Sequence, residues 1–99
     1  MTHYRMLIGG ALVDADARIE VINPATGEPF ATVPHASTAD ADAAIAAARA
    51  AQPAWGARPI AERRAALVAL ADAIAANGDE LARLMTMEQG KPLVEAKGE

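Results

Sequence analysis

The side chains that could carry out chemistry are few in this chain of 99 residues, and they are widely spaced. His3 and His35 stand far apart, and the chain has no cysteine that could join them at a metal ion or act as a nucleophile. Such centres need several donor or acid–base groups that converge. Ser37 is the only serine, and Asp40 follows it at the spacing of a capping box, which favours a helix cap over a nucleophile. The sequence therefore predicts no catalytic residue and no histidine metal site.

Phosphate-binding patterns are also missing. Gly90-Lys91 matches the end of a phosphate loop, but Pro92 stands where that loop needs Ser or Thr and Met85 where it needs Gly. No Gly-x-Gly-x-x-Gly sequence occurs, so the dinucleotide fingerprint is absent. These residues predict no cofactor-binding site of their own.

Composition narrows the classes of partner. The net charge is −4 and no basic patch occurs, so we expect no nucleic-acid partner. No apolar run reaches the roughly 20 residues of a membrane span, and no signal-peptide pattern is present, so we expect a cytoplasmic protein without a membrane partner. Hydrophobic residues make up 53%, but much of this is alanine, which buries little area. The sequence predicts a thin core, and a chain that self-associates or folds only partly when made alone.

The first third of the chain has the pattern of short strands, which we expect to be antiparallel. The predicted strands cover residues 4–8, 11–13, 18–22 and 30–33. Gly9-Gly10 suits a tight hairpin turn, and residues 23–28 contain a dense turn signal around Pro24 and Gly27.

The remainder has helical spacing and predicts three to four helices. The first follows Ser37 and ends at Pro53, with Trp55 filling the joint to the next helix. The second covers about 59–76 and stops at Asn77-Gly78. A third follows until Gly90-Lys91-Pro92, and a fourth pattern starts at Pro92 without a final cap. The chain alone is thus predicted to be an α+β fragment, the opening of a longer protein.

Two local patterns carry a resemblance to a known family. One is Val-Ile-Asn-Pro-Ala-Thr-Gly-Glu at residues 21–28, and the other is Met-Thr-Met-Glu-Gln-Gly-Lys-Pro-Leu-Val-Glu-Ala-Lys-Gly-Glu at 85–99. Together with Pro53-Ala54-Trp55 and the alanine-rich helix between them, they resemble the amino-terminal segment of NAD(P)-dependent aldehyde dehydrogenases. The stretch 83–99 is most similar to the succinate-semialdehyde dehydrogenase branch.

The resemblance implies an α/β parent protein in which residues 1–99 form the N-terminal part of the nucleotide-binding domain, with strands in 4–33 and helices in 37–99. It implies NAD or NADP as cofactor, a small aldehyde as substrate, and a homo-oligomer. In such enzymes a cysteine thiolate forms a thiohemiacetal and then a thioester, which water hydrolyses to the acid. The catalytic and cofactor-binding residues would lie outside this chain, which would be structural and inactive by itself.

The resemblance also implies a structural monovalent cation. Its ligands here would be the carbonyl oxygens of Val21 and Ile22 and the carboxylate of Glu88, since oxygen ligands suit a hard cation. The alternative for Glu88 is that it caps its helix or pairs with Lys91.

Two other interpretations of the whole chain stay open at this stage. The chain could be a stand-alone helical interaction module, or a non-functional remnant. The last helical pattern, which lacks a cap, favours the start of an oxidoreductase over both.

Overall fold

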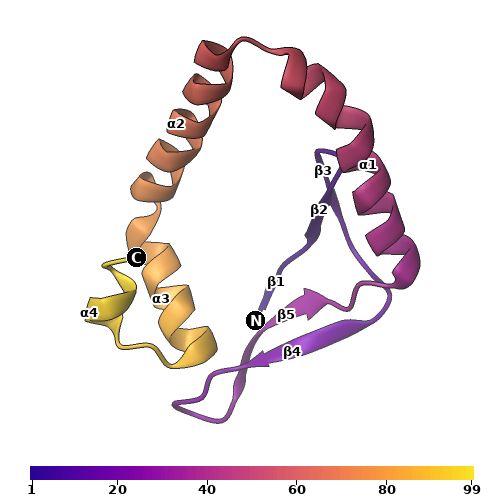
Figure 1. Cartoon of the computed structure of the whole chain (residues 1–99). Helices are drawn as coiled ribbons and strands as arrows, with labels where there is room; N and C mark the ends of the chain where they lie inside the picture. Colours follow the sequence, from indigo (N-terminus) through magenta and orange to yellow (C-terminus); the bar gives the residue numbers. More distant parts are fainter. The chain divides into compact units, whose positions relative to one another are not determined.

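The computed structural model describes all 99 residues and divides them into two compact units. The first contains Met1–Val21 and Pro29–Ala57, and the second contains Ile22–Glu28 and Arg58–Glu99. Five short strands are followed by four helices (Figure 1), which confirms the predicted fragment of short strands and then helices.

The five strands form two small sheets. One is a three-stranded sheet with the order β1-β5-β4, and the other is an antiparallel pair of β2 and β3. The strand bounds are Thr2–His3 for β1, Met6–Ile8 for β2, Ala11–Val13 for β3, Arg18–Ile22 for β4 and Pro29–Pro34 for β5. Gly9 and Gly10 form the predicted turn between β2 and β3, both with positive φ (58° and 81°).

One strand pair differs from the expectation that all strands are antiparallel. β1 was not predicted, and it runs parallel to β5, pairing Thr2 with Ala31 and His3 with Thr32. A strand of two residues is too short to show an alternating pattern. Its partner lies nearly thirty residues away, so only tertiary pairing defines it.

α1, Thr38–Ala57, begins at the capping box that the sequence predicted. The Ser37 hydroxyl accepts from the Asp40 N–H at 3.1 Å, and the Asp40 carboxylate accepts from the Ser37 N–H at 2.8 Å. The Ser37 hydroxyl also donates to that carboxylate at 2.7 Å. The box thus satisfies backbone donors that the first turn of a helix leaves unpaired.

Ser37→Ala is therefore expected to destabilise α1 by about 1 kcal/mol, because it removes the cap oxygen. Urea unfolding followed by the circular dichroism of the helices measures the change. Ser37→Gly is the control, since glycine at this position is expected to cost only a few tenths of a kcal/mol. Equal losses for both variants would contradict the capping role.

The prediction that Pro53 ends the first helix is wrong, because α1 continues through it to Ala57. Proline removes one N–H and so one hydrogen bond of the helix. Helix-favouring alanines on both sides of it support continuation. Trp55 consequently lies within α1, where it is 40% exposed and does not fill a joint.

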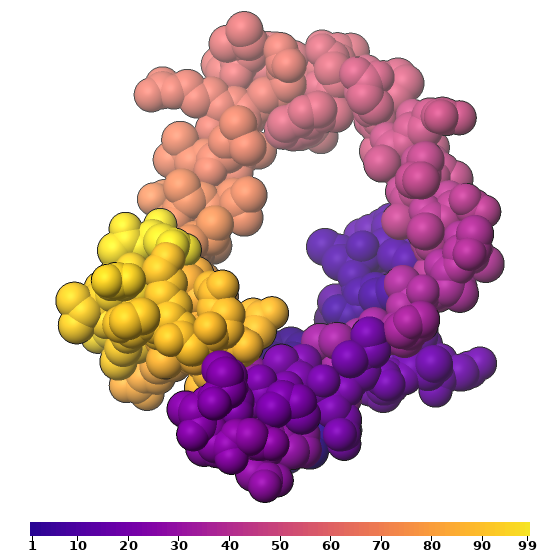
Figure 2. All heavy atoms as spheres, turned by 60° about the horizontal axis from the view of Figure 1, so that its bottom comes forward, coloured from indigo at the N-terminus to yellow at the C-terminus, as the bar shows by residue number.

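The helices of the second unit end close to the residues at which the sequence predicted their ends. α2 covers Ile60–Ala76, α3 Gly78–Gln89 and α4 Leu93–Ala96. α3 ends at Gly90, whose φ of 75° is left-handed and whose N–H donates to the Thr86 carbonyl at 2.9 Å. α3 and α4 pack together, and their orange and yellow atoms form one continuous cluster in Figure 2.

The buried core is as thin as the composition predicted. The only buried hydrophobic residues are Ala31, Ala82 and Ala96, and α2 buries none of its side chains. The large apolar side chains exposed on α2 are Ile60, Leu67, Val68, Leu70 and Ile74. No helix is both long enough and apolar enough to cross a membrane.

Candidate functional site

The turn at residues 23–28 is held by a dense set of hydrogen bonds. The Asn23 N–H donates to the Glu28 carbonyl at 2.9 Å, and the Asn23 carbonyl accepts from Gly27 at 2.8 Å. The Asn23 side-chain oxygen accepts from the Ala25 N–H at 2.9 Å, which forms an Asx turn. Gly27, part of the predicted turn, has a positive φ of 75° that glycine adopts without strain. The turn is therefore a fixed structure and not a flexible connection.

The same turn lies against the end of α3 within the second unit. A Cβ atom placed on Gly90 would lie 3.2 Å from Cγ of Pro24. This close approach brings together the two sequence patterns that carried the family resemblance. Ile22 directly precedes the turn, and Glu88 stands in the last turn of α3.

The predicted cation ligands are placed as follows. Ile22 and Glu88 belong to the second unit, whereas Val21 belongs to the first. Glu88 is exposed and forms no ion pair, because Lys91 pairs with Glu99 instead. The expected alternative of a Glu88–Lys91 pair is therefore wrong.

One polar atom of α3 was not identified from the sequence. The side-chain hydroxyl oxygen of Thr86 is buried and has no hydrogen-bond partner. An unpaired buried hydroxyl is costly and suits an additional polar ligand. No signal in the sequence marks Thr86, since its burial depends on packing.

A polar network in the first unit was also missed. The Arg18 guanidinium donates to the Thr32 hydroxyl at 2.8 Å, to the Thr32 carbonyl at 3.1 Å and to the Tyr4 carbonyl at 2.6 Å. It also pairs with Asp14, and His3 Nδ1 lies 2.7 Å from the Thr32 hydroxyl. The network ties β4 to β5 and to the segment after β1, so its role is structural.

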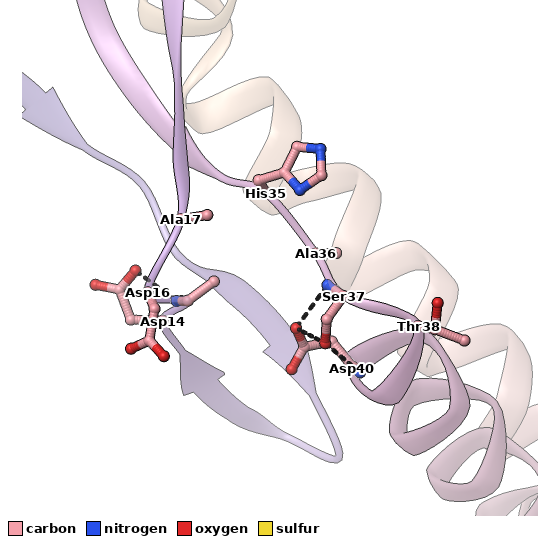
Figure 3. Close-up of a pocket in the computed structure, with 9 residues that line it drawn as sticks. Asp14, Asp16, Ala17, His35, Ala36, Ser37, Thr38 and Asp40 are labelled. Carbon is pink, nitrogen blue, oxygen red and sulfur yellow. Dashed lines mark hydrogen bonds between the residues drawn. The ribbon is translucent and has the colours of Figure 1, made fainter.

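A surface hollow in the first unit contains several acidic side chains but no assembled reactive site. Its volume is about 900 Å³. Figure 3 shows Asp14 and Asp16 on one side of it, and Ser37 and Asp40 on the other. Asp14 is engaged by Arg18 and Asp40 by the cap at Ser37. No group of three histidine, cysteine or acidic side chains in the chain could hold a metal ion.

The cap makes α1 sensitive to acid. Hydrogen bonds first from the Ser37 backbone and then from its hydroxyl lower the pKa of Asp40 below its ordinary value. Because the folded pKa is the lower one, the stabilisation is complete above the unfolded pKa and is lost as pH falls through the folded pKa.

We expect the helical circular dichroism of α1 to weaken as the pH falls below about 4, the ordinary range of an aspartate. Asp40→Asn is the control, because it keeps a hydrogen-bond acceptor without a titrating group. An unchanged acid response in that variant would assign the transition to another carboxylate.

Comparison with known proteins places these features in a family. Residues 12–99 match the aldehyde dehydrogenase family. The chain is 53% identical to glutarate-semialdehyde dehydrogenase of Pseudomonas putida over 94 residues, which are 93% of this chain and 20% of that protein. It is 46% identical to the NADP(+) succinate-semialdehyde dehydrogenase of Escherichia coli over 95 residues, 94% of this chain and 20% of that protein.

A solved structure is similar to this chain. The crystal structure of an NAD-dependent aldehyde dehydrogenase from Sinorhizobium meliloti superposes with a TM-score of 0.92 and 40% identity, over 97% of this chain and 20% of that one. The chain thus spans about a fifth of the length of the relatives that it matches. Relatives with different semialdehyde substrates are similarly close, so the identity does not single out the succinate branch.

Proposed function

This chain belongs to the aldehyde dehydrogenase family, and on that basis we propose that it is the amino-terminal part of an oxidoreductase that oxidises an aldehyde to the carboxylic acid. The match over residues 12–99 is the observation that carries the proposal. In the reaction the aldehyde carbon is oxidised by two electrons, NAD(P)+ accepts them as hydride, and water supplies the second carboxylate oxygen.

Within this proposal, residues 1–99 are the structural start of the nucleotide-binding domain. The chain has neither cysteine nor a glycine-rich dinucleotide motif, so the nucleophile and the cofactor contacts would come from other residues of the longer protein. The apolar side chains exposed on α2 support this role, because an apolar surface of this kind suits packing against further protein. The longer protein would be a cytoplasmic homo-oligomer.

The substrate class that we propose is a semialdehyde with a carboxylate at its far end. Both curated relatives described above are named for such substrates, glutarate semialdehyde and succinate semialdehyde. Succinate semialdehyde remains our specific proposal, since the stretch 83–99 carries that similarity. Glutarate semialdehyde is the competitor to be measured beside it.

The first experiment is an intact-mass measurement on native material that carries these residues, followed by an activity assay. We expect a mass several times the 10.2 kDa of this chain. The longer protein should reduce NAD+ or NADP+ with succinate semialdehyde or glutarate semialdehyde, and the 99-residue chain alone should not. A native mass of 10.2 kDa would overturn the proposal and favour an interaction module or a remnant.

A structural monovalent cation is a second, separate proposal. The carbonyl oxygens of Val21 and Ile22 and the carboxylate of Glu88 would bind it, together with an oxygen from elsewhere in the longer protein. The exposed Glu88 carboxylate at the end of α3, which no ion pair engages, is the feature of this chain that supports the proposal. Crystals of the longer protein grown with a heavier monovalent ion should show anomalous density at these atoms, and water alone there would exclude the site.

A further inference from the structure

The junction between α2 and α3 contains the only Asn-Gly pair in the chain, Asn77-Gly78. Asn77 is exposed, and a single side-chain hydrogen bond holds it, from Nδ2 to the Ala73 carbonyl at 2.8 Å. Asn77 precedes α3 directly, yet its side chain forms no cap bond to that helix. The side-chain carbonyl group is therefore free of intramolecular hydrogen bonds.

Gly78 has open space on the side where a side chain would stand. It is the first residue of α3, so its N–H has no acceptor within that helix. A Cβ atom built on Gly78 would meet no atom within 4 Å, so the space around this residue is open. A residue without a side chain to hinder attack thus follows an exposed asparagine.

From this geometry we propose that Asn77 is a site of spontaneous deamidation in the folded chain. The Gly78 nitrogen attacks Cγ of Asn77 and forms a new C–N bond. The bond from Cγ to Nδ2 breaks, and the amide leaves as ammonia with the proton that the Gly78 nitrogen gives up. Water then opens the five-membered imide at either carbonyl, which yields aspartate or isoaspartate at position 77.

Local structure sets the rate of this reaction. Asn77 has φ of −109° and ψ of 15°, and its amide is tied to Ala73. Ring closure therefore requires that this hydrogen bond open and that ψ of Asn77 rotate. Both changes occur at a single non-helical residue between two helices, where little packing opposes them.

The products alter the junction in two different ways. An aspartate at position 77 lacks the Nδ2 group that donates to the Ala73 carbonyl. It also adds a negative charge beside Asp79 and Glu80 at the start of α3. Isoaspartate inserts one more carbon into the main chain and so displaces the Asn77 carbonyl, which accepts from the Leu81 N–H at 3.0 Å. Isoaspartate would therefore loosen the first turn of α3, whereas aspartate, a favoured residue before a helix, would not.

The chain provides its own matched control at its other asparagine, Asn23. Pro24 follows Asn23, and a proline nitrogen has no hydrogen to give up, so the same ring closure is blocked. The Asn23 side chain is also fixed in the Asx turn by the Ala25 N–H at 2.9 Å. Asn77 and Asn23 thus differ at the atom that the mechanism requires.

The test is incubation of the folded protein that carries these residues, at neutral and mildly alkaline pH, followed by tryptic mapping. The peptide 65–83 contains Asn77 and no methionine, and the peptide 19–49 contains Asn23. We expect peptide 65–83 to gain the mass of an amide-to-acid conversion, faster at the higher pH, and to become a substrate of isoaspartyl methyltransferase. Peptide 19–49 should stay unchanged.

Gly78→Ala is the variant that tests the mechanism, because a Cβ meets no neighbour in the fold but hinders the attacking nitrogen. It should slow conversion several-fold without loss of helical circular dichroism. A parallel incubation in urea gives the rate of the unfolded chain. Conversion confined to unfolded protein, conversion absent from both states, or equal conversion at Asn23 would each overturn the proposal.

Discussion

Gly90→Ala is expected to lower the free energy of unfolding by about 2 kcal/mol. Two costs combine at this position. Gly90 has φ of 75°, where a side chain is strained, and its new Cβ would lie 3.2 Å from Cγ of Pro24. The proline ring is rigid and belongs to a turn fixed by several hydrogen bonds, so it cannot move away easily. Urea unfolding of the protein that carries these residues measures the loss.

Gly27→Ala separates the two costs. Gly27 has the same φ of 75°, but a Cβ there would meet no atom within 4 Å. It should therefore lose only the backbone part, about 1 kcal/mol. Equal losses at Gly90 and Gly27 would show that the contact between Pro24 and the end of α3 contributes nothing.

Arg18→Met is expected to cost about 2 kcal/mol, because hydrogen bonds from a charged donor contribute roughly 1.5–3 kcal/mol. Methionine keeps an apolar stem but removes the donors to Tyr4 and to both oxygens of Thr32. Thr32 is only 8% exposed, so water cannot fully replace the lost bonds. The same urea unfolding measures the loss, and hydrogen exchange at the Tyr4 N–H, which donates to Thr32, should become faster.

Asp14→Asn tests whether Arg18 stabilises the fold through its ion pair with Asp14 or through its hydrogen bonds to Tyr4 and Thr32. The Asp14 side chain is 57% exposed, so its pairing with Arg18 should contribute less than about 1 kcal/mol. Arg18→Lys keeps the charge but loses the planar fork, and should resemble Arg18→Met. Suppose that Asp14→Asn lowers the free energy of unfolding as much as Arg18→Met does. The hydrogen bonds from Arg18 to the Tyr4 carbonyl and to the Thr32 carbonyl and hydroxyl would then not be the source of the stabilisation.

The sequence by itself determined the features that depend on local chemistry. The cap at Ser37 and Asp40, the turn around Gly27, the end of α3 at Gly90 and the break at Asn77-Gly78 all appear where the residue types predicted them. Each depends on backbone conformation within a few residues, so its signal is contained in the local sequence. The family resemblance has a similar origin, since it rests on continuous patterns at 21–28 and 85–99.

Only the tertiary structure decided the features that join distant segments. The parallel pairing of β1 with β5, the hydrogen bonds from Arg18 to Tyr4 and Thr32, and the contact between Pro24 and Gly90 connect residues separated by 14 to 66 positions. No local preference encodes such contacts, because they arise when separate elements pack together. Pro53 is the converse case, because there a local signal for the end of a helix proved wrong. A residue that usually ends a helix lies inside α1, where the helix preference of the surrounding alanines outweighs the cost of one lost hydrogen bond.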